Sequence, residues 1–340
     1  MKRRVLVTGG CGFIGTNASL AFESEGYSVL AIDNFSRSTS KINAVELAKR
    51  KNIEVLELDI RNAKKLDSAI KAFKPTLVLH LAAQVAVTTS LENPIDDFQI
   101  NALGSMNLLE SLRFFQPSRV IFSSTNKVYG NLEKLEIVER ESRYSYANGN
   151  SQGVTEEQLF DPQSPYGCSK GAADKYFTDY NRSFGLDTIV LRQSCIYGKR
   201  QFGVEDQGWI AWFMISALKG QKVTVYGDGK QVRDALYVDD LCDLYLRIGQ
   251  IENLGARVFN VGGGADNSIS VLELLEWLKS NVSPSLAWEY GKERLGDQKI
   301  FLSDNSALKK IIGWSPTTSL AQGLFNVWNW LESNSERALN

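Results

Sequence analysis

Short apolar runs that alternate with longer helical patterns constrain the fold of this chain more than any other feature of its sequence. The runs are about four residues long and lie at Val5–Val7, Val29–Ile32, Val55–Leu58, Leu77–Leu79, Val120–Phe122 and Thr188–Leu191. A continuous apolar run indicates a strand that is buried on both faces, as in a parallel sheet covered by helices. The N-terminal half is therefore predicted to form a doubly wound α/β domain.

The pattern loosens after Arg192 into segments rich in glycine and tryptophan. Two strands and two helices are predicted in this part of the chain, over residues 223–226, 259–261, 270–278 and 320–331. The helix over 270–278 begins with a capping box, in which Ser270 and Glu273 each bond the other's backbone. We therefore expect a second, smaller C-terminal α/β lobe.

The boundaries of these units follow from the same patterns. The first domain is expected over residues 1–192 with a return segment near 230–262, the smaller lobe over 193–229 and 263–332, and a polar tail over 333–340. Residues 144–163 are rich in Asn, Ser, Gln and Glu and have no clear period, so they predict a long loop. Such a loop either contributes to a functional site or is a plain insertion.

Composition excludes several classes of protein. The 340 residues include 38 Lys and Arg and 39 Asp and Glu, so no overall positive field attracts nucleic acid or anionic lipid. The apolar runs are far shorter than the roughly 20 residues of a membrane helix. Glycines at positions 9, 10 and 12 interrupt the first run before it could serve as a signal sequence. We expect a cytoplasmic protein with no nucleic-acid or membrane partner.

The cysteines and the one histidine do not suggest metal chemistry. Cys11, Cys168, Cys195 and Cys242 lie far apart in the sequence, without the paired spacing of metal ligands. Cysteine is usually a small buried hydrophobe, and we interpret these four in that way. His80 ends an apolar run, which favours a structural histidine at a strand end. No metal site is expected.

A glycine-rich loop, Thr8–Gly15, follows the first predicted strand and opens a helix. In such a loop Gly9 permits a tight turn, Gly12 lets the backbone approach a pyrophosphate, and Gly15 packs the helix against the strand. The N-terminus of the helix then stabilises the phosphate charge. Asp33 ends the second predicted strand, where a carboxylate can accept both ribose hydroxyls. Together these features predict a Rossmann-type dinucleotide site.

The charge of Asp33 also bears on the identity of the dinucleotide. Its carboxylate would repel a 2′-phosphate, which favours NAD over NADP, whereas Arg37 keeps NADP as the alternative. We expect the cofactor to contact further residues at the loop and at the strand ends: Phe13, Ile14, Asn34, Ser36, Arg37, Asp59, Ile60, Leu81, Ala82, Ala83 and Ser123. The alternative for the residues at strand ends is that they simply terminate the strands.

Tyr166 and Lys170 stand four residues apart at the start of a long helical pattern, which places both side chains on one face. An adjacent ammonium and an oxidised nicotinamide favour the phenolate over the phenol, so such a tyrosine can take a hydroxyl proton. Thr125 ends the fifth predicted strand and could hydrogen-bond the reacting oxygen, with Ser124 as the alternative. We therefore predict Thr125, Tyr166 and Lys170 as catalytic, with Tyr166 and Lys170 also contacting the cofactor.

With these motifs the chain resembles the extended short-chain dehydrogenase/reductase family of nucleotide-sugar enzymes over essentially its whole length. The segments that carry the resemblance are residues 123–130, 164–174, 206–209 and 231–234, and they are most similar to the epimerases that act at C2 of CDP-linked sugars. The resemblance implies that tightly bound NAD oxidises a sugar hydroxyl to a ketone and reduces it again from the opposite face. It also implies a nucleotide-diphosphate sugar as substrate and a homodimer or homotetramer.

Sequence differences from other branches of the family reduce the number of reactions that we expect. Asn126 and Lys127 stand where the 4,6-dehydratases carry Asp-Glu, and this disfavours elimination of water. Cys195 stands where the 4-epimerases and many relatives carry a substrate-contacting Asn, so the sugar is expected to be held differently. A 4-epimerase or 4,6-dehydratase remains the second hypothesis. A non-catalytic NAD sensor is a third.

The resemblance also implies substrate contacts. Arg233 and Arg294 match the two family arginines that clamp the diphosphate, a role suited to a planar, permanently charged group. Other expected contacts are Gln207 and Gly208 in the nucleotide pocket, and Gln84, Thr125 and Asn126 at the sugar. Either arginine could instead be a solvated surface charge. Trp209 and Trp212 could stack on a base, but a stripe of core residues is the favoured interpretation.

Overall fold

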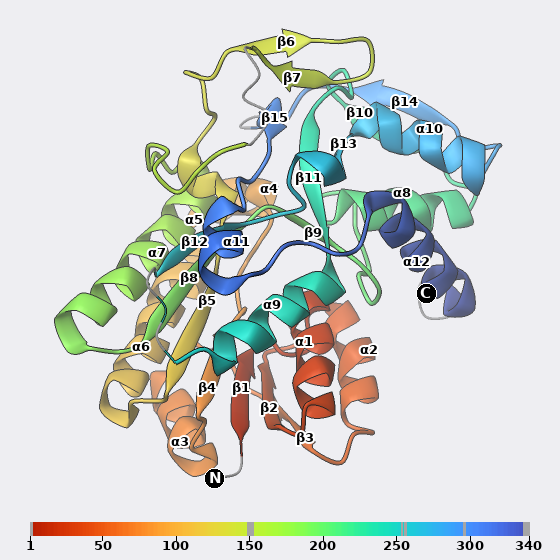
Figure 1. The fold of residues 1–340 in the computed structure, drawn as a ribbon. Coiled ribbons are helices and arrows are strands. Elements are labelled where there is room, and N and C mark those ends of the chain that lie inside the picture. The colour runs from red at the N-terminus through yellow and green to blue at the C-terminus, as the bar shows by residue number, and fades with distance from the viewer. Residues whose placement is uncertain (1–2, 148–152, 253, 255–256, 295–296, 336–340) are drawn as a thin grey trace.

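A seven-stranded parallel sheet forms the centre of the larger domain in the computed structural model, which describes residues 3–147, 153–252, 254, 257–294 and 297–335 (Figure 1). The strand order is β12-β8-β5-β4-β1-β2-β3. The strands are β1 (Arg4–Thr8), β2 (Ser28–Asp33), β3 (Ile53–Glu57), β4 (Leu77–His80), β5 (Arg119–Thr125), β8 (Thr188–Gln193) and β12 (Val258–Val261). The predicted doubly wound α/β fold is confirmed.

Helices cover both faces of this sheet. One layer consists of α1 (Phe13–Ser24), α2 (Ser38–Leu47) and α9 (Val238–Gln250), and the other of α3 (Ala63–Phe73), α6 (Gly104–Phe115) and α7 (Ser164–Phe184). Successive side chains of a strand enter opposite layers, so Val5 and Val7 pack with the first layer and Leu6 with the second. This double burial explains why the strands are continuous apolar runs.

Short helical segments follow β4 and β5 at the carboxyl edge of the sheet. After β4 the chain forms α4 (Val87–Glu92), α5 (Pro94–Phe98) and a π-helix (Gln99–Leu103) before it enters α6. After β5 it forms a 3₁₀ helix over Asn126–Tyr129. These segments place polar side chains where the strands end, the usual position of ligand sites in such sheets.

A smaller lobe lies above the sheet in Figure 1. Its strand β11 (Val232–Tyr237) pairs with β9 (Cys195–Tyr197), β13 (Ser268–Ser270) and β15 (Ile300–Phe301), while β10 (Val223–Tyr226) pairs with β14 (Trp288–Gly291). The helices α8 (Trp209–Leu218), α10 (Val271–Asn281) and α12 (Leu320–Ser333) share its core. The capping box at Ser270 and Glu273 is present as predicted.

The return segment near 230–262 divides between the two units. Strand β11 belongs to the sheet of the lobe, whereas α9 and β12 return to the large domain. A second crossing follows: α11 (Ser306–Ile312) brings Leu308 to the core of the large domain, which Trp314 also joins, although both lie within the segment expected in the lobe. The chain therefore crosses between the units more often than the sequence patterns predict.

The expectation of a loop over residues 144–163 is wrong at its start. Strand β7 (Tyr144–Tyr146) pairs antiparallel with β6 (Ile137–Glu139), and Val154 bridges to Ser303. Residues 148–152 and most of the predicted tail, 336–340, lie outside the described residues. Within the described ranges, every helix is too short or too polar to cross a membrane.

Candidate active site

The glycine loop between β1 and α1 permits a close approach of backbone to backbone. Gly9 has φ +67°, and a Cβ added there would lie 2.8 Å from the backbone N of Ala82. A Cβ on Gly15 would lie 2.1 Å from the carbonyl O of Gly9. Gly12 caps α1 without any side-chain hydrogen bond. The loop thus requires glycines and leaves the first turn of α1 accessible to an anion.

A cavity of about 410 Å³ opens beside this loop. It is lined by every residue that the sequence assigns to the cofactor, namely Gly9, Gly12, Phe13, Ile14, Gly15, Asp33, Asn34, Ser36, Arg37, Asp59, Ile60, Leu81, Ala82, Ala83, Ser123, Tyr166 and Lys170. The sequence did not predict the lining by Thr39, Asn43, Thr89, Asp96 and residues 200–203. These residues belong to no contiguous motif that sequence reasoning could use.

Asp33 is buried at the end of β2 and faces the glycine loop. Its Oδ2 accepts from the backbone N of Cys11 at 3.1 Å and its Oδ1 from that of Phe35 at 3.0 Å. Burial raises the pKa of Asp33, while hydrogen bonds from the backbone partly offset this rise. The guanidinium of Arg37 donates to Gln207, so Arg37 is held against the lobe.

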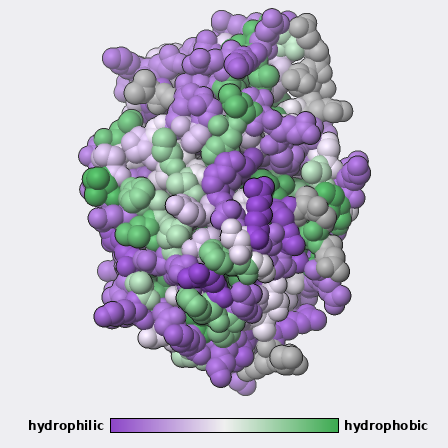
Figure 2. Space-filling model, turned by 90° about the vertical axis from the view of Figure 1, so that its left-hand side faces the viewer, coloured by the Kyte–Doolittle hydropathy of each residue, from purple (hydrophilic) through white to green (hydrophobic). Residues whose placement is uncertain are grey.

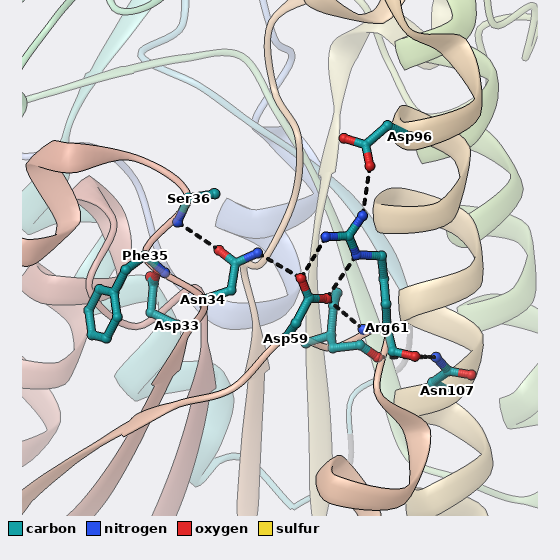
Figure 3. A network of polar contacts seen from close by, with 9 residues as sticks. Asp33, Asn34, Phe35, Ser36, Asp59, Arg61, Asp96 and Asn107 are labelled. Carbon is teal, nitrogen blue, oxygen red and sulfur yellow. Dashed lines mark hydrogen bonds and ion pairs between the residues drawn. The ribbon is translucent and has the colours of Figure 1, made fainter.

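A polar network at the ends of β2 and β3 borders the same cavity (Figure 3). Asn34 donates to Asp59 at 2.9 Å, and Arg61 bonds both Asp59 at 2.8 Å and Asp96 at 2.6 Å. These bonds, those of Arg61 first, lower the pKa of Asp59 to about 2. Asp59 is therefore an ionised, fixed acceptor. Sequence reasoning did not predict that Arg61 and Asp96 take part in this network.

The three predicted catalytic residues meet where β5 ends and α7 begins. A hydrogen bond with Thr125 lowers the pKa of Tyr166, but burial outweighs it and raises that pKa to about 12. Lys170 Nζ donates to the carbonyl O of Ser123 at 2.6 Å and lies 4.3 Å from the ring centroid of Phe122. Burial lowers the pKa of Lys170 to about 7, against the opposing charges of Asp174 and Asp97.

Ser124, the alternative to Thr125, has a structural role. Its Oγ donates to Asp174 at 2.7 Å, and Asp174 forms two bonds with Arg192, at 2.9 and 3.0 Å. The carboxylate is fully buried and the guanidinium nearly so. Ser124 also lines the cofactor cavity, but its hydroxyl is engaged by Asp174, whereas Thr125 bonds Tyr166.

A second buried network supports the start of α7 from the side of α5. Ser169 Oγ donates to Asp97, which also accepts from Asn101 at 3.1 Å and from Gln84 at 2.9 Å. The Gln84 amide bonds Ala86 as well, through both its N and its O. Gln84 lines the cofactor cavity, and its side chain is occupied with these protein partners. Its predicted contact with the sugar gains no support from this geometry.

His80 is structural, as expected. Ser105 donates to the backbone of Asn101, so it accepts from His80 Nε2 at 2.9 Å, and Nδ1 then accepts from Thr8 Oγ1 at 2.6 Å. Burial lowers the pKa of His80 to about 3, which keeps the ring neutral.

The predicted substrate residues of the lobe are less closely grouped than the predicted cofactor residues. Arg233 pairs with Asp297 at 2.6 Å, and Arg294 pairs with Asp206 at 3.0 Å while it lies over the ring of Tyr226. Asp297, the partner of Arg233, and Tyr226, the ring under Arg294, line a cavity of about 150 Å³, whereas the two arginines are not among its lining residues. The sequence did not predict Asp297 as a partner of Arg233.

The remaining substrate candidates lie in different places. Asn126 donates to Gln298 at 3.3 Å, on the side of Arg233 and Asp297. Gln207 instead lines the cofactor cavity, where it accepts from Arg37. Gly208 caps α8 with φ +75° beside Gln201. Arg294 donates to Asp206 and to the carbonyl O of Glu205, just before Gln207, so the structure brings this segment beside Arg294. Trp209 and Trp212 pack against the core of the lobe, in agreement with the favoured interpretation.

Comparison with known proteins identifies the family. The NAD dependent epimerase/dehydratase family matches residues 5–262. The chain belongs to this family. Its cofactor is NAD, and it is an enzyme of the nucleotide-sugar epimerase family. The glycine cradle, the cavity and the carboxylate of Asp33 fit this cofactor.

Individual relatives cover nearly the whole chain. A CDP-paratose 2-epimerase of Salmonella typhi is 40% identical over 97% of this chain and 99% of its own length, and a putative UDP-glucose 4-epimerase of Methanocaldococcus jannaschii is 33% identical over 97% and 99%. Among solved structures, a UDP-glucose 4-epimerase of Thermotoga maritima with UDP-glucose has a TM-score of 0.83 at 30% identity, covering 98% of this chain and 99% of its own. The Thermus thermophilus UDP-glucose 4-epimerase complex with NAD has a TM-score of 0.80 at 29% identity, covering 97% and 99%.

Proposed function

We propose that this enzyme inverts C2 of a CDP-linked hexose or dideoxyhexose, with CDP-paratose and CDP-tyvelose as the foremost pair and CDP-glucose and CDP-mannose as the second. The observation that carries the proposal is the 40% identity with a CDP-paratose 2-epimerase over almost the full length of both chains. Tyr166 and Lys170, which line the cofactor cavity, and Thr125, which bonds Tyr166, support it. Asn126 and Lys127, in place of an acid pair, argue against dehydration.

NAD, held by the glycine loop and Asp33, would supply the hydride acceptor for oxidation of the sugar and the hydride donor for its reduction from the opposite face. Tyr166 takes the proton of the C2 hydroxyl and gives it back, which requires its pKa to fall from about 12 when the positively charged nicotinamide is in place. Thr125, already bonded to Tyr166, donates to the sugar oxygen. Lys170, held by the carbonyl of Ser123, positions the ribose of the cofactor and adds positive charge next to the phenol.

The lobe holds the nucleotide end of the substrate in this mechanism. Arg233 and Arg294 bind the diphosphate, and the ketone turns about this anchor to expose its other face. Release of NAD during the cycle would lose the hydrogen that must be returned, so the cofactor is expected to stay bound throughout.

Proton NMR of the sugar ring after incubation with CDP-paratose or CDP-glucose in deuterated water tests the proposal. A C2-inverted product without deuterium at C2 is the expected result. Inversion with deuterium at C2 would contradict hydride transfer, and a C4-inverted or 4-keto-6-deoxy product would establish one of the other family reactions. UDP-glucose is the parallel substrate, because the Methanocaldococcus jannaschii relative is a putative UDP-glucose 4-epimerase.

We further propose that the enzyme forms a homo-oligomer through the side formed by α5, the π-helix, α6 and α7. Exposed apolar residues gather there: Ile95, Phe98, Leu103, Phe114, Tyr176 and Phe184. Figure 2 faces this side of the molecule and shows hydrophobic patches among polar ones. Phe114→Glu is expected to yield monomers by light scattering, whereas Tyr290→Glu, on the lobe, is not. Equal mass for both variants and the wild type would contradict the proposal that the enzyme oligomerises through this surface.

A further inference from the structure

A segment of the lobe extends to the cofactor cavity of the large domain. Residues 199–207 connect β9 to α8, and both of these elements belong to the lobe. Residues 200–203 and Gln207 nevertheless line the cofactor cavity together with the glycine loop. We refer to residues 199–207 as the strap. The strap is therefore a wall of the cofactor cavity that the lobe supplies.

The side chain of Arg200 fastens the start of the strap to the two helices beside the glycine loop. Its Nη1 donates to Asn17 Oδ1 in α1 at 3.1 Å, and its Nε and Nη2 donate to Glu46 Oε1 in α2 at 3.0 and 2.6 Å. Asn17 also donates through Nδ2 to the carbonyl O of Lys199 at 3.0 Å. The side chain of Arg200 is 15% exposed, so solvent screens its pair with Glu46 less than it would at an open surface.

The backbone of Arg200 has a conformation that residues with a Cβ rarely adopt. Its φ is +67°, in the left-handed region where the Cβ crowds the following carbonyl oxygen. A glycine at this position would relieve the strain. The hydrogen bonds of the side chain with Asn17 and Glu46 are the contacts that offset it. Backbone strain that side-chain contacts hold in place directs attention to a function of that side chain.

Further contacts hold the two ends and the middle of the strap. Lys199 Nζ donates to Asp239 in α9 at 2.9 Å, and Gln207, at the far end, accepts from Arg37, which follows β2. The middle is packed on its own lobe, because a Cβ on Gly203 would lie 2.5 Å from the backbone N of Trp212 in α8. The strap can move away from the large domain only if its bonds at both ends break.

The partners of the strap lie in α1, in α2 and in the turn between β2 and α2, next to the glycine loop and Asp33. These are the parts of the cavity that are assigned to the pyrophosphate and the ribose of NAD. We propose that Arg200 is a positioning residue that fastens the strap over bound NAD, and that breaking its bonds with Asn17 and Glu46 limits the release of NAD. The inference depends on NAD as the cofactor and is independent of which sugar carbon is inverted.

The test measures the release of NAD rather than turnover. Each protein is loaded with radiolabelled NAD, mixed with excess unlabelled NAD, and separated from free nucleotide by rapid gel filtration at successive times. Arg200→Met is expected to release NAD at least about tenfold faster than the wild type, because charge-assisted hydrogen bonds are lost. Glu46→Gln keeps the shape of a residue that lies outside the cavity lining but removes its charge, and it is expected to release NAD about threefold faster. Arg247→Met, which removes an ion pair with Asp243 in α9, is the control and is expected to match the wild type.

Arg200→Gly separates fastening of the strap from folding of the chain. Glycine removes the side chain and relieves the left-handed backbone, so NAD-free Arg200→Gly is expected to unfold at a temperature no lower than that of Arg200→Met, and to release NAD as fast. Hydrogen exchange of residues 199–207 is expected to rise in both Arg200 variants and in Glu46→Gln. Release of NAD at the wild-type rate in the Arg200 variants would overturn the proposal. Faster release in those variants with wild-type release and exchange in Glu46→Gln would mean that Arg200 contacts NAD directly, and would also overturn it.

Discussion

The cofactor cavity and the small cavity of the lobe are built in different ways. The first is bordered by the ends of consecutive parallel strands, so residues that are neighbours in the sequence are also neighbours in the site, as in the glycine loop. The second is bordered by β7, the end of β10, the loop before β11, Glu293 and residues 297–299. Contiguous motifs therefore identify the cofactor site, whereas only the folded chain brings the substrate residues together.

Among the variants that test this comparison, Tyr166→Phe is expected to have the largest effect on activity. The variant lacks the group that exchanges the sugar proton, so activity should fall about 10²- to 10⁴-fold. The ring still fills its place, and the NAD content of the purified protein should not change. Tyr176→Phe, on the exposed side of the same helix, is the control. Activity in Tyr166→Phe within tenfold of the wild type would remove the tyrosine from its role.

Gly15→Ala tests the cofactor cavity by geometry. The new Cβ would lie 2.1 Å from the carbonyl O of Gly9, so the loop must open and its fit to a pyrophosphate is lost. NAD content, measured from the absorbance of the released nucleotide, is expected to fall at least about tenfold. Gly249→Ala in α9 meets only the flexible end of Leu77 and serves as the control. Full NAD content in Gly15→Ala would contradict the assignment of the glycine loop to the pyrophosphate of NAD.

Arg233→Met and Arg294→Met probe the lobe. The side chain of Arg233 is 13% exposed and that of Arg294 is 29% exposed, so solvent screens the second more strongly. We expect KM for the CDP-sugar to rise about tenfold for Arg233→Met and about threefold for Arg294→Met, with little change in kcat. A larger increase of KM for Arg294→Met than for Arg233→Met would show that the lobe holds the diphosphate differently.

The last prediction concerns stability rather than activity. Burial lowers the pKa of Lys170 to about 7 in the folded chain from the ordinary 10.5 of a lysine, so the unfolded chain binds more protons between these two pH values. Stability from this group therefore rises with pH across that window, and the charged lysine costs stability below pH 7. Lys170→Met is expected to be more stable than the wild type at pH 6 by on the order of a few kcal/mol, with the gap narrowing toward pH 10.

Urea unfolding of NAD-free protein at several pH values measures that gap. Lys175→Met, exposed on the same helix, should show no such trend. A gap that is independent of pH would mean that the charge of Lys170 is already well compensated by Asp97 and Asp174.

Features that depend on residues close together in the sequence could be predicted from the sequence. The sheet, the glycine loop and the spacing of Tyr166 and Lys170 follow from local periodicity and local geometry. The pairing of Arg233 with Asp297 is a contact across 64 positions, and the network around Asp97 joins α5, the π-helix and α7. Isolated acidic residues have no periodic signature, which is why Asp97, Asp96 and Asp297 escaped sequence reasoning.

Residues that contact the predicted catalytic groups follow one another at the end of β5. Ser123 holds Lys170, Thr125 bonds Tyr166, and Lys127 follows on the next turn. In the proposed function, Thr125 and the residues that serve Tyr166 come before Asn126, the proposed sugar contact, so a change at Asn126 leaves them in place. Insertion of a single residue before Thr125 would invert the pleat and abolish activity.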